Sequence, residues 1–160
     1  MTSQTIIRTQ HYWDEVTIDE ELPGFTLVLD WRRMADQVSG SQDFYPVHHD
    51  PDFATEAGHP GIFYNTGFTR AALCRLLTDF AGDDGWLRML DFQMRRMNHN
   101  GDVLQVRARV TGKTEVSAEE GDVEVDVWIE NSREGVTTPG KAIVRLARKR
   151  HGPDGDRQRC

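Results

Sequence analysis

The chain has 160 residues and a formal net charge of −7 at pH 7, which suits one domain with a hydrophobic core and disfavours general binding to nucleic-acid phosphates. Hydrophobic residues make up 38% of the sequence, and no apolar run approaches the roughly 20 residues that cross a bilayer. The first residues lack the charged and apolar segments of a secretory signal, and Cys74 and Cys160 give neither a disulfide framework nor a zinc spacing, so a cytoplasmic protein is predicted.

The chain begins with a polar segment, residues 1–24, which is predicted to be irregular and to close in a turn at Pro23-Gly24. Three short elements are predicted next: a strand over 25–29, a helix over 31–38 that Gly40 ends, and a helix over 51–57. Asp30 stands directly before the first of these helices. Its side chain is therefore expected to cap the helix.

The longest helical pattern runs from about Ile62 to Phe80, and Gly82 follows as its stop. Small and apolar residues occupy more than one side of this helix, which predicts that another layer of the protein wraps around it.

Downstream of the long helix the hydrophobic period changes from 3.6 to 2, which predicts strands. Four alternating segments lie over 90–94, 104–110, 123–129 and 142–147, with turns predicted at Asn100-Gly101-Asp102, Gly112-Lys113, Glu120-Gly121-Asp122 and Pro139-Gly140. Four consecutive half-exposed strands are typical of an antiparallel sheet. The predicted fold class is therefore α+β: a single hotdog-like domain whose curved antiparallel sheet wraps one long central helix.

The candidate chemistry lies in Ser39–Asp50. Asp43 and His48 stand five positions apart in a stretch that Gly40 and Pro46 interrupt, so a loop is predicted to hold both. A carboxylate and an imidazole form a possible acid/base pair, because both exchange protons near neutral pH once burial or a neighbour tunes them. The same residue types also make ordinary turns, and the spacing alone leaves that interpretation open.

This stretch resembles the signature of MaoC-like enoyl-CoA hydratases and dehydratases, which runs approximately Ser-Gly-Asp-x-Asn-Pro-(Leu/Ile/Val)-His-x-Asp. The matching residues are Ser39, Gly40, Asp43, Pro46, Val47, His48 and Asp50. The resemblance extends over the long helix and the later strands and places one hotdog domain at 25–148. The polar ending, 149–160, has nothing to bury and is predicted to be a solvated tail.

The resemblance implies that Asp43 is the catalytic aspartate and His48 the catalytic histidine. In related enzymes this pair holds water against the double bond of a trans-2-enoyl thioester of coenzyme A or an acyl carrier protein. The resemblance also places an oxyanion site at the start of the long helix, near Asn65, Thr66 and Gly67. The free N–H groups of a helix start suit the charge that develops on the thioester oxygen.

Two features depart from the family pattern. Tyr45 stands where the signature usually has Asn, and Tyr64-Asn65-Thr66 replaces a more typical Ala-His-Gly. Tyr45 and Tyr64 are expected to line the substrate pocket. Within the family, Asp-Phe-x-x-Val-His-His-Asp followed by Ile-Phe-x-Asn is similar to the catalytic subunit of the hydratase that acts on shortened steroid side chains.

Other candidate sites in the chain have weaker support. His48, His49, Asp50 and His59 suggest a metal site, but no second ligand cluster supports it, and the resemblance implies no metal and no cofactor beyond the carrier of the substrate. His49 is expected to be structural or solvent-facing. The residues expected to be core filler or a buried thiol are Met89, Met94, Met97 and Cys74.

The leading hypothesis is an enoyl-thioester hydratase or dehydratase. Two alternatives remain: a hotdog acyl-CoA thioesterase, and a non-catalytic acyl-binding or partner subunit. The resemblance implies a homodimer or a heterodimer with another hotdog chain, and no nucleic-acid or membrane partner. The acyl group, the carrier and the direction of the reaction stay open.

Overall fold

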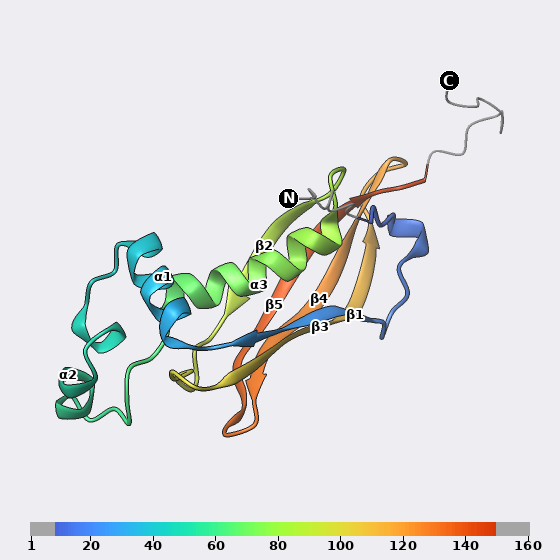
Figure 1. Cartoon of the computed structure of the whole chain (residues 1–160). Helices are drawn as coiled ribbons and strands as arrows, with labels where there is room; N and C mark the ends of the chain where they lie inside the picture. Colours follow the sequence, from blue (N-terminus) through green and yellow to red (C-terminus); the bar gives the residue numbers. More distant parts are fainter. Residues whose placement is uncertain (1–8, 150–160) are drawn as a thin grey trace, which may run out of the picture.

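The computed structural model describes residues 9–149, which form one antiparallel sheet that curves over a long helix (Figure 1). The five strands are β1 (Glu21–Val28), β2 (Trp86–Phe92), β3 (Val103–Glu115), β4 (Glu120–Asn131) and β5 (Gly135–Ala147). Their order across the sheet is β1-β3-β4-β5-β2, and every neighbouring pair is antiparallel. This confirms the predicted α+β fold. The predicted tail lies outside the described residues except for its first residue, Lys149.

The helices gather the functional stretch at one end of the sheet. They are α1 (Trp31–Ser41), α2 (Pro51–Glu56) and α3 (Thr66–Ala81), with short 3-10 turns η1 (Trp13–Glu15) and η2 (Pro46–His48). The side chains of Asp30, Asp50 and Asn65 cap the three α-helices by accepting backbone N–H groups. In Figure 1, α1 and α2 lie beside the end of the sheet where α3 begins. The loop between α1 and α2 is thereby brought close to the first turn of α3.

The core lies between α3 and the concave face of the sheet. The buried face of α3 consists of Thr69, Ala72, Leu73, Leu76, Leu77, Phe80 and Ala81. Each fully buried aliphatic side chain contributes about 1.5–3 kcal/mol through removal of apolar surface from water. The opposite side of α3 stays exposed, for example at Arg70 and Arg75. The curved sheet therefore covers the buried face of the helix, as predicted, and leaves the opposite side exposed.

Two predicted breakpoints near the start of the chain are wrong. Helix α1 continues through Gly40, and it ends where Gln42 adopts a left-handed φ of 57°. Pro23-Gly24 lies inside β1 at a bulge. A Cβ at Gly24 would stand 2.5 Å from the carbonyl oxygen of Val106, so this glycine permits a close approach of two strands.

Three of the four turns predicted in the second half are also wrong. Gly112-Lys113 lies within β3 at a bulge, Glu120-Gly121-Asp122 begins β4, and Pro139-Gly140 lies within β5. At Gly140 a Cβ would stand 2.7 Å from the backbone oxygen of Asp91 on β2. The fourth turn, Asn100-Gly101-Asp102, is confirmed, because Gly101 has a φ of 96° between β2 and β3.

An ion pair fastens β4 to β5 at the end of the sheet far from α1 and α2. The Asp122 carboxylate accepts from Arg145 Nε at 2.7 Å and Nη2 at 3.1 Å, and also from Arg88 Nη1 at 2.9 Å. Asp122 and Arg145 expose only 17% and 13% of their side chains. The hydrogen bonds from Arg145, working against partial burial, lower the pKa of Asp122 from its ordinary value.

We expect Asp122→Asn to make the protein less stable at neutral pH and to remove part of its acid sensitivity. A carboxyl whose pKa is lowered by folding contributes stability above its unfolded pKa of about 4, and the contribution is lost as pH falls through the folded pKa. The free energies of unfolding of the two proteins should therefore converge as pH falls. Urea unfolding followed by circular dichroism between about pH 7 and about pH 3 measures this difference. An equal difference at both ends would contradict the assignment.

Candidate active site

The structure brings Asp43 and His48 together. Asp43 lies in the loop after α1, and His48 is the last residue of η2. Their Oδ2 and Nε2 atoms are 3.4 Å apart, with 41% of the Asp43 side chain and 8% of the His48 side chain exposed. An accessible carboxylate thus faces a buried imidazole, which is the arrangement that an acid/base pair needs.

One backbone carbonyl determines the orientation of His48. The Nδ1 atom lies 2.8 Å from the carbonyl oxygen of Phe63. A carbonyl oxygen only accepts hydrogen bonds, so Nδ1 carries the proton. In the neutral ring Nε2 is then the acceptor, and it is the atom that faces Asp43.

Asn65 joins the first turn of α3 to the carboxylate of Asp43. Its Nδ2 donates to Asp43 Oδ2 at 3.0 Å and to Ser41 Oγ at 2.9 Å, while its Oδ1 accepts the Phe68 N–H at 2.8 Å. The Asn65 backbone N–H donates to Gln37 Oε1 at 3.2 Å. All the donors of Asn65 are engaged within the protein, so they are not free for the predicted oxyanion site.

Thr66 and Gly67 are the first two residues of α3. At these positions the backbone N–H groups have no intrahelical partner, and they lie at the positive end of the helix dipole. Both residues line a cavity of about 360 Å³ next to Asp43 and His48. The first turn of α3 therefore lies in the same cavity as Asp43 and His48.

The same cavity collects every site residue predicted from the sequence. Its lining consists of Asp43, Tyr45, Val47, His48, Phe63, Tyr64, Asn65, Thr66, Gly67, Met94 and Met97. Met89, Met94 and Met97 were expected in the core, and this expectation is wrong: Met94 and Met97 line the cavity, and Met89 and Met97 are 39% and 36% exposed. Flexible thioethers give the cavity an adaptable apolar wall.

The two tyrosines of the cavity differ in their surroundings. Tyr45 is 57% exposed, and its ring lies edge-on to the rings of His48 and Phe53 at 6.4 and 5.9 Å. Tyr64 is buried, and its hydroxyl donates to the carbonyl oxygen of Asp30 at 3.1 Å. Burial raises the pKa of the Tyr64 hydroxyl well above its ordinary value. Tyr64 therefore keeps its proton and serves as part of the wall.

The histidines near the motif are occupied by other contacts. His49 Nε2 lies 3.0 Å from the carbonyl oxygen of Phe44, and Asp50 caps α2. The ring of His59 packs against that of Phe63, with the centroids 4.7 Å apart and the planes tilted by 55°. Within residues 9–149, no group of three or more His, Cys, Asp or Glu side chains is arranged to hold a metal ion. Cys74 is partly buried in α3.

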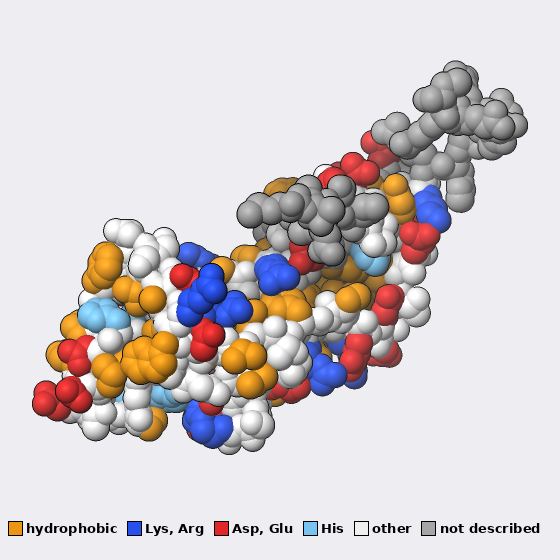
Figure 2. Space-filling model, viewed as in Figure 1, with side chains coloured by type: hydrophobic (Ala, Val, Ile, Leu, Met, Phe, Trp, Pro, Cys, Tyr) orange, Lys and Arg blue, Asp and Glu red, His pale blue; other side chains and the backbone are white. Residues whose placement is uncertain are grey.

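A larger hollow, of about 420 Å³, lies on the other face of the sheet. Its lining includes Trp128, Pro139 and Lys141, which alternate with the core residues of β4 and β5. It contains neither Asp43 nor His48, both of which line the smaller cavity. Figure 2 shows exposed hydrophobic side chains over the α1 and α2 end, and Phe44, next to Tyr45 in the chain, is 58% exposed.

No helix within the described part of the chain is long and apolar enough to cross a membrane.

The chain therefore has a hotdog-type domain in which Asp43 and His48 share a cavity with the start of the long helix. The model of the MaoC-like domain family matches residues 32–132. This match spans more than half of the chain, and the protein belongs to the MaoC-like domain family.

Solved structures with the same fold include three of similar size. The ChsH1–ChsH2 complex from Mycobacterium tuberculosis contains a chain with 22% identity and a TM-score of 0.72, covering 81% of this chain and 98% of that one. An (R)-hydratase of A. caviae involved in PHA biosynthesis has 16% identity and a TM-score of 0.72 over 82% and 98% of the two chains. A MaoC-like dehydratase from Rhodospirillum rubrum has 17% identity and a TM-score of 0.75 over 87% and 98%. At these identities the likeness shows the fold alone. Among curated proteins, none matches this chain.

Sequence reasoning missed the residues that support the pair. The Phe63 contact uses a backbone carbonyl, which every residue type provides, so no sequence signal marks it. Gln37 did carry a signal, because it is a polar residue next to Val38 on the buried face of α1. Its carboxamide oxygen accepts the backbone N–H of Asn65 and so holds the start of α3 against α1.

The contact between Asn65 and Asp43 should be visible as an energetic coupling. Asn65→Asp keeps an oxygen acceptor for the Phe68 N–H but places a second carboxylate against Asp43, so we expect it to be destabilising. Adding Asp43→Asn to this variant again pairs an amide with a carboxylate, because residue 43 now donates and residue 65 accepts. The double variant should therefore be more stable than the two single changes predict, by about 1 kcal/mol. Urea unfolding of the four proteins measures the coupling, and strictly additive effects would refute the contact.

Proposed function

We propose that this protein is a hydro-lyase that adds water reversibly to the double bond of a trans-2-enoyl thioester. The observation that carries the proposal is the convergence of Asp43 and His48, 3.4 Å apart, on a cavity that also contains the start of α3. Membership of the MaoC-like family supports a hydratase or dehydratase activity. The thioester carrier is coenzyme A or an acyl carrier protein.

The proposed mechanism begins with a water molecule held by two acceptors. Because His48 Nδ1 donates to the Phe63 carbonyl, His48 Nε2 presents a lone pair to the cavity, and the neighbouring Asp43 Oδ2 presents another. A water molecule that donates one hydrogen to each has an oxygen lone pair free for the substrate. That oxygen forms a bond to the β-carbon, the pair accepts one proton from the water, and the pair delivers one proton to the α-carbon. The thioester bond stays intact, and the pair ends in its starting protonation state.

Negative charge develops on the thioester oxygen while the new carbon–oxygen bond forms. We assign its stabilisation to the backbone N–H groups of Thr66 and Gly67, since the donors of Asn65 are already engaged. Preorganised donors of this kind lower the barrier because they require no reorientation during the reaction. The acyl chain would lie against the apolar wall that includes Phe63, Met94 and Met97.

The proposed reaction needs only water, the thioester and these groups, so it uses no metal and no cofactor apart from the carrier on the substrate. The proposed assembly is a homodimer or a heterodimer with another hotdog chain. The heterodimer gains support from the similarity to a chain of the ChsH1–ChsH2 complex, which is itself an assembly of two proteins.

Substitution of either member of the pair should remove most turnover. We expect Asp43→Asn and His48→Ala each to lower kcat about 100-fold or more, because general acid/base groups contribute rate factors of that order. Loss of the conjugated enoyl absorbance of crotonyl-CoA and of a bulkier enoyl-CoA measures the rate. His49→Ala is the matched control, since that ring binds the Phe44 carbonyl and does not line the cavity. A full rate in either test variant would exclude that residue as a catalyst.

The same assays separate the alternatives. Release of free thiol from a saturated acyl-CoA, without hydration of an enoyl-CoA, would identify a thioesterase. A folded wild-type protein that hydrates no enoyl thioester, alone or with a second hotdog chain, would refute the proposed function and favour a binding role.

The oxyanion assignment can be tested by removing a single N–H group. Proline is well tolerated at the first position of a helix, and Thr66 occupies that position after an extended Asn65 with ψ of 169°. We expect Thr66→Pro to keep the fold and to lower kcat roughly 100-fold, as loss of one oxyanion donor does elsewhere. Thr66→Ala keeps the N–H group and should keep the rate. Similar rates in both variants would remove the Thr66 N–H from the mechanism.

A further inference from the structure

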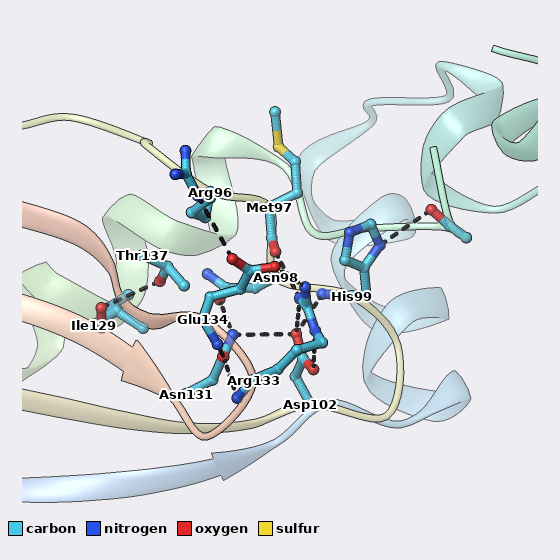
Figure 3. A network of polar contacts seen from close by, with 11 residues as sticks. Arg96, Met97, Asn98, His99, Asp102, Ile129, Asn131, Arg133, Glu134 and Thr137 are labelled. Atoms are coloured by element: carbon cyan, nitrogen blue, oxygen red, sulfur yellow. Dashed lines mark hydrogen bonds and ion pairs between the residues drawn. The ribbon is translucent and has the colours of Figure 1, made fainter. Parts of the chain in front are cut away.

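A buried polar cluster lies where the turn before β3 meets the hairpin between β4 and β5 (Figure 3). At its centre the Asp102 carboxylate accepts from the His99 N–H at 2.9 Å, from Asn131 Nδ2 at 3.2 Å, and from Arg133 Nη2 at 2.8 Å and Nε at 3.2 Å. Asn131 Nδ2 also donates to Asn98 Oδ1 at 3.0 Å. The side chains of Asn98 and Asn131 are almost completely buried, and 12% of the Asp102 side chain is exposed.

The charge of Asp102 strengthens this cluster. Partial burial by itself acts to raise the pKa of the carboxyl, but the hydrogen bonds from Arg133 and the His99 N–H outweigh it and hold the pKa below its ordinary value. Hydrogen bonds to an ionised acceptor are about twice as strong as neutral ones. The carboxylate therefore fixes the backbone at His99 and the side chain of Arg133 at the same time.

The cluster holds the segment 97–100 from one side, and the candidate active site lies on the other. Arg133 Nη2 donates to the carbonyl oxygen of Met97 at 3.0 Å, and the Met97 residue lines the cavity. The next carbonyl, that of Asn98, accepts the Tyr64 N–H at 3.0 Å, and His99 forms a β-bridge with Phe63. The segment is thus the strand-like partner that positions residues 62–64.

This partner segment carries the carbonyl that orients the imidazole. The Phe63 oxygen, which accepts the proton of His48 Nδ1 at 2.8 Å, belongs to the residue bridged to His99. A displacement of 97–100 would move that oxygen and release the imidazole to adopt its other tautomer or another orientation. Misplacement of a reacting group by about 1 Å can cost a factor of about 100 in rate.

We infer that Asp102, held by Arg133, is a positioning residue for His48, acting through the 97–100 segment and the Phe63 carbonyl. It touches neither the substrate nor the acid/base pair. The inference rests on the proposed function for its kinetic consequence, whereas the orientation of the His48 ring can be observed without any turnover.

Asp102→Asn tests the inference. The amide carries no charge, and it offers one oxygen to the donors of His99, Asn131 and Arg133, which share two carboxylate oxygens in the wild type. We expect kcat for enoyl-CoA hydration to fall about tenfold to a hundredfold, with KM changed less than about twofold, since the cavity keeps its lining. Long-range proton–nitrogen correlation spectra of the ¹⁵N-labelled protein report the tautomer of His48, assigned by the loss of its signals in His48→Ala. The wild type should show a single Nδ1–H form, and Asp102→Asn should show added Nε2–H form or exchange broadening.

Asp122→Asn is the matched control. It removes the charge from a carboxylate that an arginine also binds through two nitrogens, but at the opposite end of the sheet. We expect it to lower stability while it leaves kcat and the His48 spectrum unchanged. If Asp102→Asn does not fold, Arg133→Gln serves in its place. The Arg133 side chain is 40% exposed, and its loss leaves the His99 and Asn131 contacts to Asp102 intact.

A folded Asp102 or Arg133 variant with wild-type kcat and an unchanged His48 spectrum would overturn the inference. So would equal effects of Asp102→Asn and Asp122→Asn on both readouts, because the role of Asp102 would then be general stability. If the wild type hydrates no enoyl thioester, the proposed function fails. A change of the His48 tautomer confined to the Asp102 and Arg133 variants would still support the positioning role.

Discussion

The candidate site depends on one carboxamide, that of Asn65. Its oxygen closes the first turn of α3 and its nitrogen binds the carboxylate of Asp43, so the same group contributes to the beginning of the helix and to the position of that carboxylate. An Asn suits both tasks because it presents an acceptor and two donors on a short side chain. The two residues that follow it, Thr66 and Gly67, line the cavity that contains the carboxylate.

The curved sheet explains why this end of α3 is available for chemistry. Strands β3, β4 and β5 bury the helix along one face, and the hydrophobic energy of that contact is independent of the residues at the helix start. The loop between α1 and α2 closes over the first turn and supplies Asp43 and His48 from outside the sheet. The hydrophobic core and the candidate site are therefore located in different parts of the chain, and the candidate site contains a partly exposed carboxylate beside a buried imidazole.

Periodicity predicted the elements of this fold better than it predicted their ends. The pattern of α3 and the alternation in β3, β4 and β5 reflect burial along one face, which is a property of the local sequence. The turn rule for glycine and proline failed at Pro23-Gly24 and Pro139-Gly140, because Gly24 and Gly140 lie within strands and permit close contact with the neighbouring strand. That contact depends on a strand distant in sequence, and a local turn rule does not contain it.

The residues of the candidate site likewise include some that the sequence could predict and some that it could not. Asp43 and His48 could be singled out because their side-chain chemistry and their resemblance to a family motif are both written in the sequence. The Phe63 carbonyl has no residue-specific signal, and the cluster around Asp102 joins a turn to a hairpin 29 residues away. Yet the tautomer of His48 follows from that carbonyl: with Nδ1 committed to Phe63, only Nε2 can accept a proton in the cavity. The tautomer of His48 is therefore determined by the backbone carbonyl of Phe63, which lies outside the motif.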